Sequence, residues 1–540
     1  MEIVRRARSR QARFEWLRTR SFPWTWNRRF RCDERVGRFC LTHDADHRPP
    51  GEEPEEVRRE REGLIDELEL ASVSLPGDGW IAGQRVRYLV EAGRHRDALS
   101  AAASCRAQPP WWCRALSGYA FLAAGLPGRA EFAFAEALRL MPPDERCRWR
   151  DISLFLKGEV RRSYRRLRCG RRGGVEARFW WLADPLWSQS GNDRRLEHLA
   201  RHVIDRMQTD ARSAFGVPWG ADLRELLLRY GWPGRWERRP SNRVDLAADP
   251  SIVSHDPPAI RCFLPPSRLL EDPASIRSDE WSLEPPRPFS GYAPRHLAGF
   301  DTLAHQFARF RSGDSVVLVG AYDVGSDSGW VAGPVRAALM AARSEEASPA
   351  AVIDDQAPLA GALRVAFPSR SVVASLEVLS RAQRRAARAR YGIPAAPRNR
   401  FVAEISDLLI TRAVDPPPTS LDEAIPLARG SLRAPPGERL GLYWEVYGLS
   451  PAGEKLSVAF TLRREGRSWL RALAETVGLA GGRPAVRLEW EESTAAGEVT
   501  WRRGLSVQLP ELKRGPYVLR VEVGTRGRET MAAERRLIIQ

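Results

Sequence analysis

Lysine is almost absent from this basic chain. Of its 85 basic residues, only Lys157, Lys455 and Lys513 are lysines, so 82 are arginines. A net charge of +17 would ordinarily indicate a polyanionic partner. Such one-sided use of arginine, beside much alanine, glycine and proline, is instead typical of a GC-rich genome. The net charge by itself therefore identifies no partner.

Long apolar runs are missing as well. No stretch reaches the roughly 18–20 apolar residues that span a bilayer, so we expect no transmembrane segment. The first twenty residues are charged, but no apolar core of roughly 7–15 residues follows, so they are not a secretory signal as written. A length of 540 residues predicts three or four domains, at roughly 100–200 residues each.

Catalytic and metal-binding motifs are also lacking. The chain has no GxSxG, no P-loop, no GxGxxG that opens a helix and no HExxH. His198 and His202 lie four residues apart, but Glu197 precedes both, which is not the metalloprotease order. Potential ligands crowd residues 43–47, yet a Pro/Gly/Glu-rich segment follows them, so we expect no metal and no cofactor. We therefore expect a protein that is not an enzyme. The alternative is a hydrolase-like site assembled from distant residues near the Trp-rich segment.

No CxxC pair occurs among the seven cysteines, which excludes a zinc ribbon and a thioredoxin motif. Cys32 and Cys40 enclose seven residues, and so do Cys105 and Cys113. This spacing allows two local disulfides in an oxidising compartment and favours the cell envelope or periplasm. Buried, reduced thiols are the alternative.

Residues 1–54 form a basic arm and a Pro/Glu linker. Residues 1–31 contain ten arginines against Glu2 and Glu15, with Trp16, Trp24 and Trp26 among them. We expect a helical arm that packs on the folded body through its tryptophans. Nucleic-acid binding through this arm is an alternative that we do not favour.

Helical periodicity over residues 55–175 predicts a repeat-like region. Its best part resembles a tetratricopeptide repeat, with a degenerate copy 32 residues earlier. The matching positions are Gly118, Phe121, Gly125, Ala130, Phe134, Ala137 and Pro142, and in the earlier copy Gly93 and Ala98. The resemblance implies a concave face that binds a protein partner. A generic helical bundle is the alternative.

Residues 176–240 are rich in tryptophan and predict a small helical domain. The elements that recur in order are Trp180, Trp181, Asp184, Pro185, Asn192, Asp193, Trp219, Asp222, Arg229, Tyr230, Gly231 and Pro233. Together they resemble the GWxTD domain, a bacterial domain of unknown molecular function. Pro218 and Ala221 depart from its motif. We expect structural roles: Asp222 caps helix 221–230 or bonds an arginine, and Trp219 fills the pocket behind it.

The rest of the chain predicts a Pro-rich connector and two β domains. Residues 241–295 form the connector, an extended strap packed on the fold. Period-two alternation predicts antiparallel sandwiches over 296–414 and 425–540, joined by a linker at 415–424. Within the first sandwich we expect residues 381–394 to form a short basic helix or loop. We expect Asp323–Asp327 to form a hairpin turn rather than a calcium site.

The sequence therefore predicts a multidomain α + β protein. Its expected function is that of a non-catalytic scaffold or adaptor that binds protein partners through the helical repeats.

Overall fold

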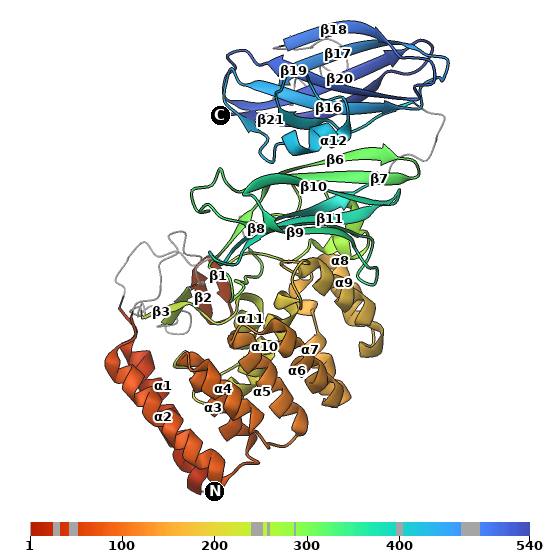
Figure 1. Cartoon of the computed structure of the whole chain (residues 1–540). Helices are drawn as coiled ribbons and strands as arrows, with labels where there is room; N and C mark the ends of the chain where they lie inside the picture. Colours follow the sequence, from red (N-terminus) through yellow and green to blue (C-terminus); the bar gives the residue numbers. More distant parts are fainter. Residues whose placement is uncertain are drawn as a thin grey trace. The chain divides into compact units, whose positions relative to one another are not determined.

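The computed structural model describes residues 2–24, 33–42, 52–238, 252–255, 260–285, 288–395, 403–465 and 486–540. The chain divides into two compact units. A helical unit comprises Met1–Asp272 and Asp279–Phe300, and a β unit comprises Pro273–Ser278 and Asp301–Gln540. The predicted multidomain α + β fold is confirmed (Figure 1). Within these ranges no helix is long and apolar enough to cross a bilayer.

The helical unit is built from consecutive helices. They are α1 (Glu2–Ser21), α2 (Glu55–Ser74), α3 (Gly79–Glu91), α4 (His95–Ala103), α5 (Pro110–Ala123), α6 (Pro127–Leu140), α7 (Pro143–Arg150), α8 (Gly158–Arg166), α9 (Gly173–Ala183), α10 (Asp193–Thr209) and α11 (Ala221–Tyr230). Short 3-10 turns lie at η1 (Ser153–Phe155), η2 (Cys169–Arg171) and η3 (Ser267–Leu270). A four-stranded sheet of β1 (Glu34–Val36), β2 (Phe39–Thr42), β4 (Ile252–His255) and β3 (Arg235–Arg238), in that order, completes the unit.

The helices α5 and α6 form the hairpin that the repeat-like spacing predicts. A side-chain carbon on Gly118 would lie 2.7 Å from the Phe134 ring, so only glycine allows this close approach. Gly125 takes a positive φ of +73° at the turn, and Gly93 takes +71° at the turn between α3 and α4. The inward-facing Ala98, Ala130 and Ala137 are fully buried, and Phe121 is half-buried. Pro142 follows the end of α6 and precedes α7.

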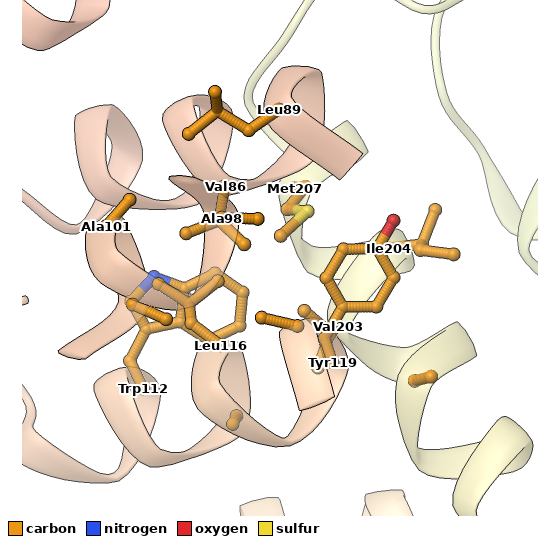
Figure 2. Close-up of a cluster of buried hydrophobic side chains, with 14 of the residues drawn as sticks. Val86, Leu89, Ala98, Ala101, Trp112, Leu116, Tyr119, Val203, Ile204 and Met207 are labelled. Carbon is orange, nitrogen blue, oxygen red and sulfur yellow. The ribbon is translucent and has the colours of Figure 1, made fainter. Parts of the chain in front are cut away.

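The helix α10 fills the face formed by α3 and α5. Figure 2 shows Val203, Ile204 and Met207 of α10 among side chains of α3, α4 and α5. The core therefore joins the predicted 55–175 region to the predicted Trp-rich segment, because both contribute to one apolar cluster. A segment of the same chain thus covers much of the face on which we expected a partner.

The helix α1 packs along α2, but not through its tryptophans. Ala7 and Phe14 are its buried apolar residues, whereas Trp16 is 50% and Trp24 is 47% exposed. The expectation of Trp-mediated packing is wrong for Trp16. Trp24 does contact the folded body, because the guanidinium of Arg238 lies 4.2 Å from its ring centroid. Trp26 lies outside the described ranges. Charge explains the docking, since α1 carries seven arginines and two glutamates and α2 carries seven acids and three arginines.

The β unit begins with a two-sheet sandwich. One sheet has the order β10 (Ala360–Pro368), β7 (Ser315–Asp323), β6 (Ala304–Ser312). The other has the order β5 (Gly299–Thr302), β12 (Arg385–Ile393), β11 (Val372–Ser380), β8 (Val335–Ala342), β9 (Ala350–Ala357). The 3-10 turn η4 (Pro273–Ser275) adjoins β12. Apolar side chains of the two sheets meet in one core.

Two local expectations within this sandwich are wrong. The basic stretch expected as a helix or loop contains β12, which pairs antiparallel with β11. Its Arg390 is accommodated in the sandwich because it pairs with Glu377 of β11 at 2.9 Å, and both side chains are 1% exposed. The segment after Asp323 is not a hairpin, since β7 and β8 belong to different sheets. The carboxylates of Asp323 and Asp327 accept hydrogen bonds from backbone N–H groups of that connection.

The second sandwich repeats this plan. Its first sheet contains β13 (Glu404–Ile405), β16 (Arg439–Tyr447), β14 (Leu409–Arg412) and β19 (Thr500–Gln508), and β16 pairs with all three of the others. Its second sheet has the order β15 (Arg433–Ala434), β21 (Met531–Ile539), β20 (Gly515–Thr525), β17 (Lys455–Arg464), β18 (Val486–Ser493). The helix α12 (Leu421–Ala424), within the predicted linker, and the turn η5 (Ile425–Leu427) lie between β14 and β15. The strands β13 and β14, which we expected in the first sandwich, pair with β16 of the second. The two sandwiches share a small apolar cluster, to which Phe310 and Tyr443 contribute.

Candidate functional site

A pocket of about 290 Å³ lies in the helical unit where α3, α5 and α7 meet α10. Three indoles line it, from Trp80 of α3, Trp112 of α5 and Trp149 of α7. His202 and the C-terminal turn of α10 form the opposite wall, and Arg224 of α11 reaches its edge. Gly83 of α3 leaves room for the Trp112 indole, because a side-chain carbon on it would come within 3.1 Å of that ring.

Two histidines follow one face of α10 behind the pocket. His202 stacks on Trp149 at 5.4 Å between ring centroids, and the Nε2 of His198 lies 3.1 Å from the Trp149 carbonyl oxygen. Burial, and next the charge of Arg224, lowers the pKa of His202 to about 3. Burial, and next His202, lowers the pKa of His198 well below its usual range. Both rings are therefore neutral near pH 7, and the Nε2 of His202 is buried without a hydrogen-bond partner among the described residues.

Asp205 connects the pocket to the motif residue Trp219. The indole N–H of Trp219 donates to Asp205 Oδ1 at 2.8 Å, and Arg224 Nε donates to Asp205 Oδ2 at 2.9 Å. Both carboxylate oxygens are thus occupied from within the chain. Trp219 also packs between the main core and the smaller apolar cluster under the β1–β2 hairpin. Its role is to orient a pocket wall.

Asp222 holds the β1–β2 hairpin rather than capping its own helix. The helix α11 begins at Ala221 with Gly220 in the cap position, so the capping alternative is wrong. Arg38 in the hairpin turn binds Asp222 with two nitrogens, at 2.6 and 2.9 Å. These hydrogen bonds from Arg38 lower the pKa of Asp222 to about 2. The second alternative, a bond to an arginine, describes the geometry.

The Arg229–Tyr230–Gly231 element surrounds a buried guanidinium. Arg201 of α10 donates to the carbonyl oxygens of Leu228, Arg229 and Gly291, at 3.0–3.2 Å. It thereby satisfies carbonyls at the end of α11, where helices leave such groups without partners. A side-chain carbon on Gly231 would lie 2.7 Å from Arg201, so glycine makes room for it.

The Pro-rich connector packs over this helix end as an extended strap. Arg229 donates to the Phe289 carbonyl at 3.0 Å, and the Tyr230 hydroxyl donates to the Pro288 carbonyl at 3.2 Å. Pro233 is buried just beyond α11. The predicted strap is therefore present over residues 288–291, where backbone carbonyls and arginine side chains hold it.

The earlier motif residues form a second aromatic group beside α10. Trp180 lies 4.9 Å from His198 between centroids, and Trp181 stacks on Trp187. Asn192 caps α10 by accepting from Arg195 N at 2.9 Å. Asp184 is half-buried and Pro185 is buried. Burial, and next the charge of Glu197, raises the pKa of Asp193 to about 7.

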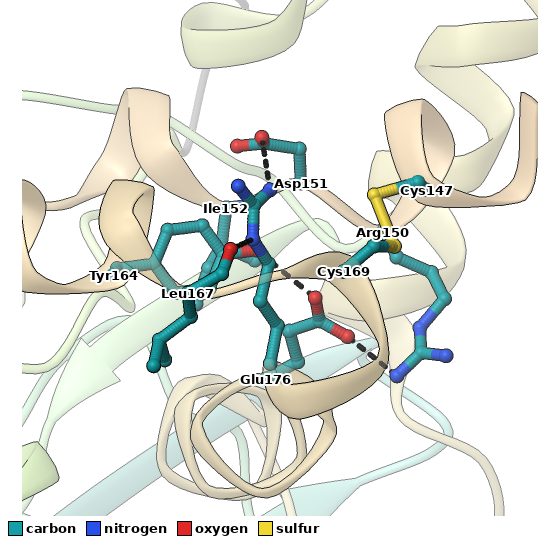
Figure 3. The surroundings of a disulfide bond; sticks show 9 residues. Cys147, Arg150, Asp151, Ile152, Tyr164, Leu167, Cys169 and Glu176 are labelled. Carbon is teal, nitrogen blue, oxygen red and sulfur yellow. Dashed lines mark hydrogen bonds and ion pairs between the residues drawn. A yellow bond between two sulfur atoms is a disulfide. The ribbon is translucent and has the colours of Figure 1, made fainter. Parts of the chain in front are cut away.

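Disulfides tie the outer helices. Cys105 and Cys113 are bonded as predicted. A second bond joins Cys147 to Cys169 and was not predicted, because 21 intervening residues hide the pairing in the sequence (Figure 3). The predicted pair of Cys32 and Cys40 has one member outside the described ranges. Cys262 is a buried free thiol.

Most pocket groups are already engaged. Glu145 accepts from the Trp149 indole at 2.8 Å and pairs with Arg148, and Asp205 is held as described. The guanidinium of Arg206 lies over the Trp111 and Trp112 rings, 4.8 and 5.0 Å from their centroids. Over the described parts of the chain, no three His, Cys, Asp or Glu side chains are placed to hold a metal ion. The ligand-like residues 43–47 lie outside those parts. The pocket therefore offers aromatic walls and arginine, and its acids are committed to internal partners.

Sequence reasoning found Trp219 and the two histidines but missed Asp205, Arg224 and Trp149, the residues that assemble the pocket. The only signal for Asp205 was its place on α10, three residues after His202. Trp180 and Trp181 lie away from the pocket, in the second aromatic group.

No protein-family model and no curated protein matches the sequence. Solved structures show only partial likeness. They include red sea bream transglutaminase, with 11% identity over 44% of this chain and 31% of that chain and a TM-score of 0.15. A Bacteroides uniformis β-glucuronidase matches with 8% identity over 42% of this chain and 26% of that chain and a TM-score of 0.17. Latent PorU from Porphyromonas gingivalis matches with 12% identity over 43% of this chain and 20% of that chain and a TM-score of 0.19. The chain spans less than a third of the length of each, and such low scores carry no argument about function.

Proposed function

We propose that this protein is a non-catalytic adaptor whose helical unit anchors one side chain of a partner peptide in the Trp80–Trp112–Trp149 pocket. Size supports this occupant. Small-molecule sites usually enclose about 300–1,000 Å³, and this pocket, at about 290 Å³, suits a single anchoring side chain. Buried aromatic pockets of this kind accept the anchors that dominate protein interfaces.

The electrostatics of the pocket support binding over catalysis. A general base works best with a pKa near the working pH, whereas the pKa of His202 is about 3. Asp205 is held by an indole and a guanidinium. The observation that carries the proposal is the aromatic pocket itself, in which the histidine is neutral and the acids are committed.

The position of the pocket also indicates which part of the helical unit contacts the partner. Because α10 covers the face of α3 and α5, the partner engages the pocket at the end of this face rather than the whole concave surface. The bonds Cys105–Cys113 and Cys147–Cys169 support an oxidising compartment such as the cell envelope. The sandwiches serve as spacers or docking domains.

We also propose that residues 176–240 are a divergent GWxTD domain. Trp219, Asp222 and Gly231 each make a specific contact around α10, α11 or the adjoining hairpin, which supports a structural origin for the motif.

The adaptor proposal is tested with a displayed peptide library selected on the full-length protein. Affinities of the selected peptides are then measured for the wild type and for Arg206→Ala. We expect Arg206→Ala to weaken binding at least about tenfold, as loss of a contact beside an anchor does. Arg96→Ala, which removes an exposed arginine of α4, is the matched control and should leave affinity unchanged. Peptides that bind Arg206→Ala as tightly as the wild type would show that they bind outside this pocket.

A hydrolase-like function is the second candidate. Asp193 lies 3.3 Å from the Nδ1 of His296, and the pKa of this carboxyl is about 7. Such an acid–histidine pair is what a site assembled from distant residues would use. Turnover of model esters or peptides that disappears in Asp193→Asn would favour this candidate over the adaptor.

A further inference from the structure

The densest positive charge of the described helical unit is not on α1. Residues 157–172 contain eight basic residues and one acid, a formal charge of +7 in a chain whose total is +17. These residues include α8 and η2 and together form the α8 segment.

Helical geometry gathers the arginines of α8 on one side. At about 100° per residue, Arg161, Arg162, Arg165 and Arg166 fall within an arc of about 140°. Tyr164 points away from this arc and is 2% exposed. One face of α8 is therefore basic and the opposite face is its anchor.

Four arginines of the α8 segment have no counter-charge. Arg165, Arg166, Arg168 and Arg171 are exposed, and none of their guanidinium groups forms a hydrogen bond or ion pair with a described residue. By contrast Arg162 pairs with Glu159, and Arg172 binds Asp151 at 2.9 Å. Four like charges held close together repel one another, so an external anion would stabilise them.

A disulfide and two hydrogen bonds hold the α8 segment in place (Figure 3). The Cys147–Cys169 bond ties η2 to α7. The Tyr164 hydroxyl donates to the buried Glu176 at 2.9 Å, and Arg172 donates to the Leu167 carbonyl at 3.0 Å. Ordering the basic face therefore costs little entropy on binding.

We propose that the α8 segment docks this protein on an anionic phospholipid surface. Charge complementarity supports it, because clustered arginines are attracted to phosphate headgroups. Leu167 lies between Arg166 and Arg168 and is 36% exposed, which adds an apolar contact for the headgroup region. Single-stranded nucleic acid is disfavoured, because such binding uses open aromatic faces and the one aromatic residue of the segment, Tyr164, is buried.

The test is sedimentation of the full-length protein with phospholipid vesicles. Vesicles of phosphatidylcholine alone are compared with vesicles containing roughly one third phosphatidylglycerol. We expect binding only to the anionic vesicles, with affinity that falls as salt rises. Each arginine removed should weaken binding about fivefold, so the variant with Arg165, Arg166, Arg168 and Arg171 all changed to Gln should lose several hundredfold.

A matched control removes the same charge from the β unit. Arg343, Arg370, Arg381 and Arg526 are exposed, and changing all four to Gln should leave vesicle binding unchanged. The smaller variant Arg165→Gln with Arg166→Gln should lose about 25-fold, which keeps the test usable if the larger variant folds poorly. Equal losses in the α8 variant and the control would overturn the proposal, as would no binding to anionic vesicles. Binding of a short DNA duplex with the same arginine dependence, but not of vesicles, would assign the surface to nucleic acid instead.

Discussion

Two arginine-rich stretches of the helical unit, α1 and the α8 segment, obtain their counter-charges in different ways. Most arginines of α1 meet acids of the same chain, as in the Arg10–Glu60 and Arg18–Glu91 pairs. Four arginines of the α8 segment meet none among the described residues. The number of arginines in a stretch therefore does not show whether it is a core element or a binding surface. The positions of the acids decide between these roles.

The deepest part of the α1 contact shows how strongly such acids act. Glu15 is fully buried and binds Arg87 at 2.6 Å and the Tyr88 hydroxyl at 2.7 Å. Gln11 of α1 also donates to the Tyr88 hydroxyl, at 2.9 Å. Through these contacts with α3, the basic helix α1 becomes part of the core.

The largest expected effect comes from removing this acid. Glu15→Ala leaves Arg87 and Arg18 with Glu91 alone, and an undercompensated buried charge costs about 3–5 kcal/mol. Urea unfolding of the full chain measures the loss. Glu2→Ala removes an exposed glutamate of the same helix and should change stability by less than about 0.5 kcal/mol. Similar values for the two variants would show that the Glu15 contacts do not stabilise the fold.

Acid should weaken the contact between α1 and α3 through Glu91. Burial alone would raise the pKa of Glu91, but Arg87 and Arg18 outweigh it and lower the pKa to about 2. A carboxyl with a lowered pKa stabilises the fold above its ordinary pKa. Its contribution is lost as the pH falls from about 4.5 to about 2. Stability measured over this range should fall more steeply for the wild type than for Glu91→Gln. Parallel curves would contradict this linkage.

The partly exposed pair of Arg38 and Asp222 should contribute an intermediate amount to the free energy of unfolding. Arg38 is 46% and Asp222 is 15% exposed at the side chain, so Asp222→Ala should cost about 1 kcal/mol. Arg38→Ala should cost about as much, and the double variant little more than either. Thermal unfolding of the three variants provides the cycle. Fully additive losses would mean that the two side chains act separately.

The smallest effect on stability is expected for the arginines of the α8 segment. Changing Arg165, Arg166, Arg168 and Arg171 to Gln should alter the free energy of unfolding by less than about 0.5 kcal/mol per residue, because they have no internal partner. A small gain is expected at low salt, where their mutual repulsion is least screened. A loss as large as that of Glu15→Ala would reveal a structural role instead.

Much of the fold was predictable because its signals are local. Periodicity located α2, the α5–α6 hairpin, α10 and many strands of both sandwiches, but not β12. The candidate site was less predictable, because Trp149, Asp205 and Arg224 come from three different helices.

The sequence by itself determined the elements of this protein, since helix and strand periods and turn residues act over a few positions. Only the tertiary structure decided which charges are buried. Arg201 lies in the core because it meets the carbonyls of Leu228 and Gly291. Arg390 of β12 is buried because it meets Glu377 of β11. These arginines need acceptors from distant parts of the chain to be buried, and no local pattern shows where those acceptors lie.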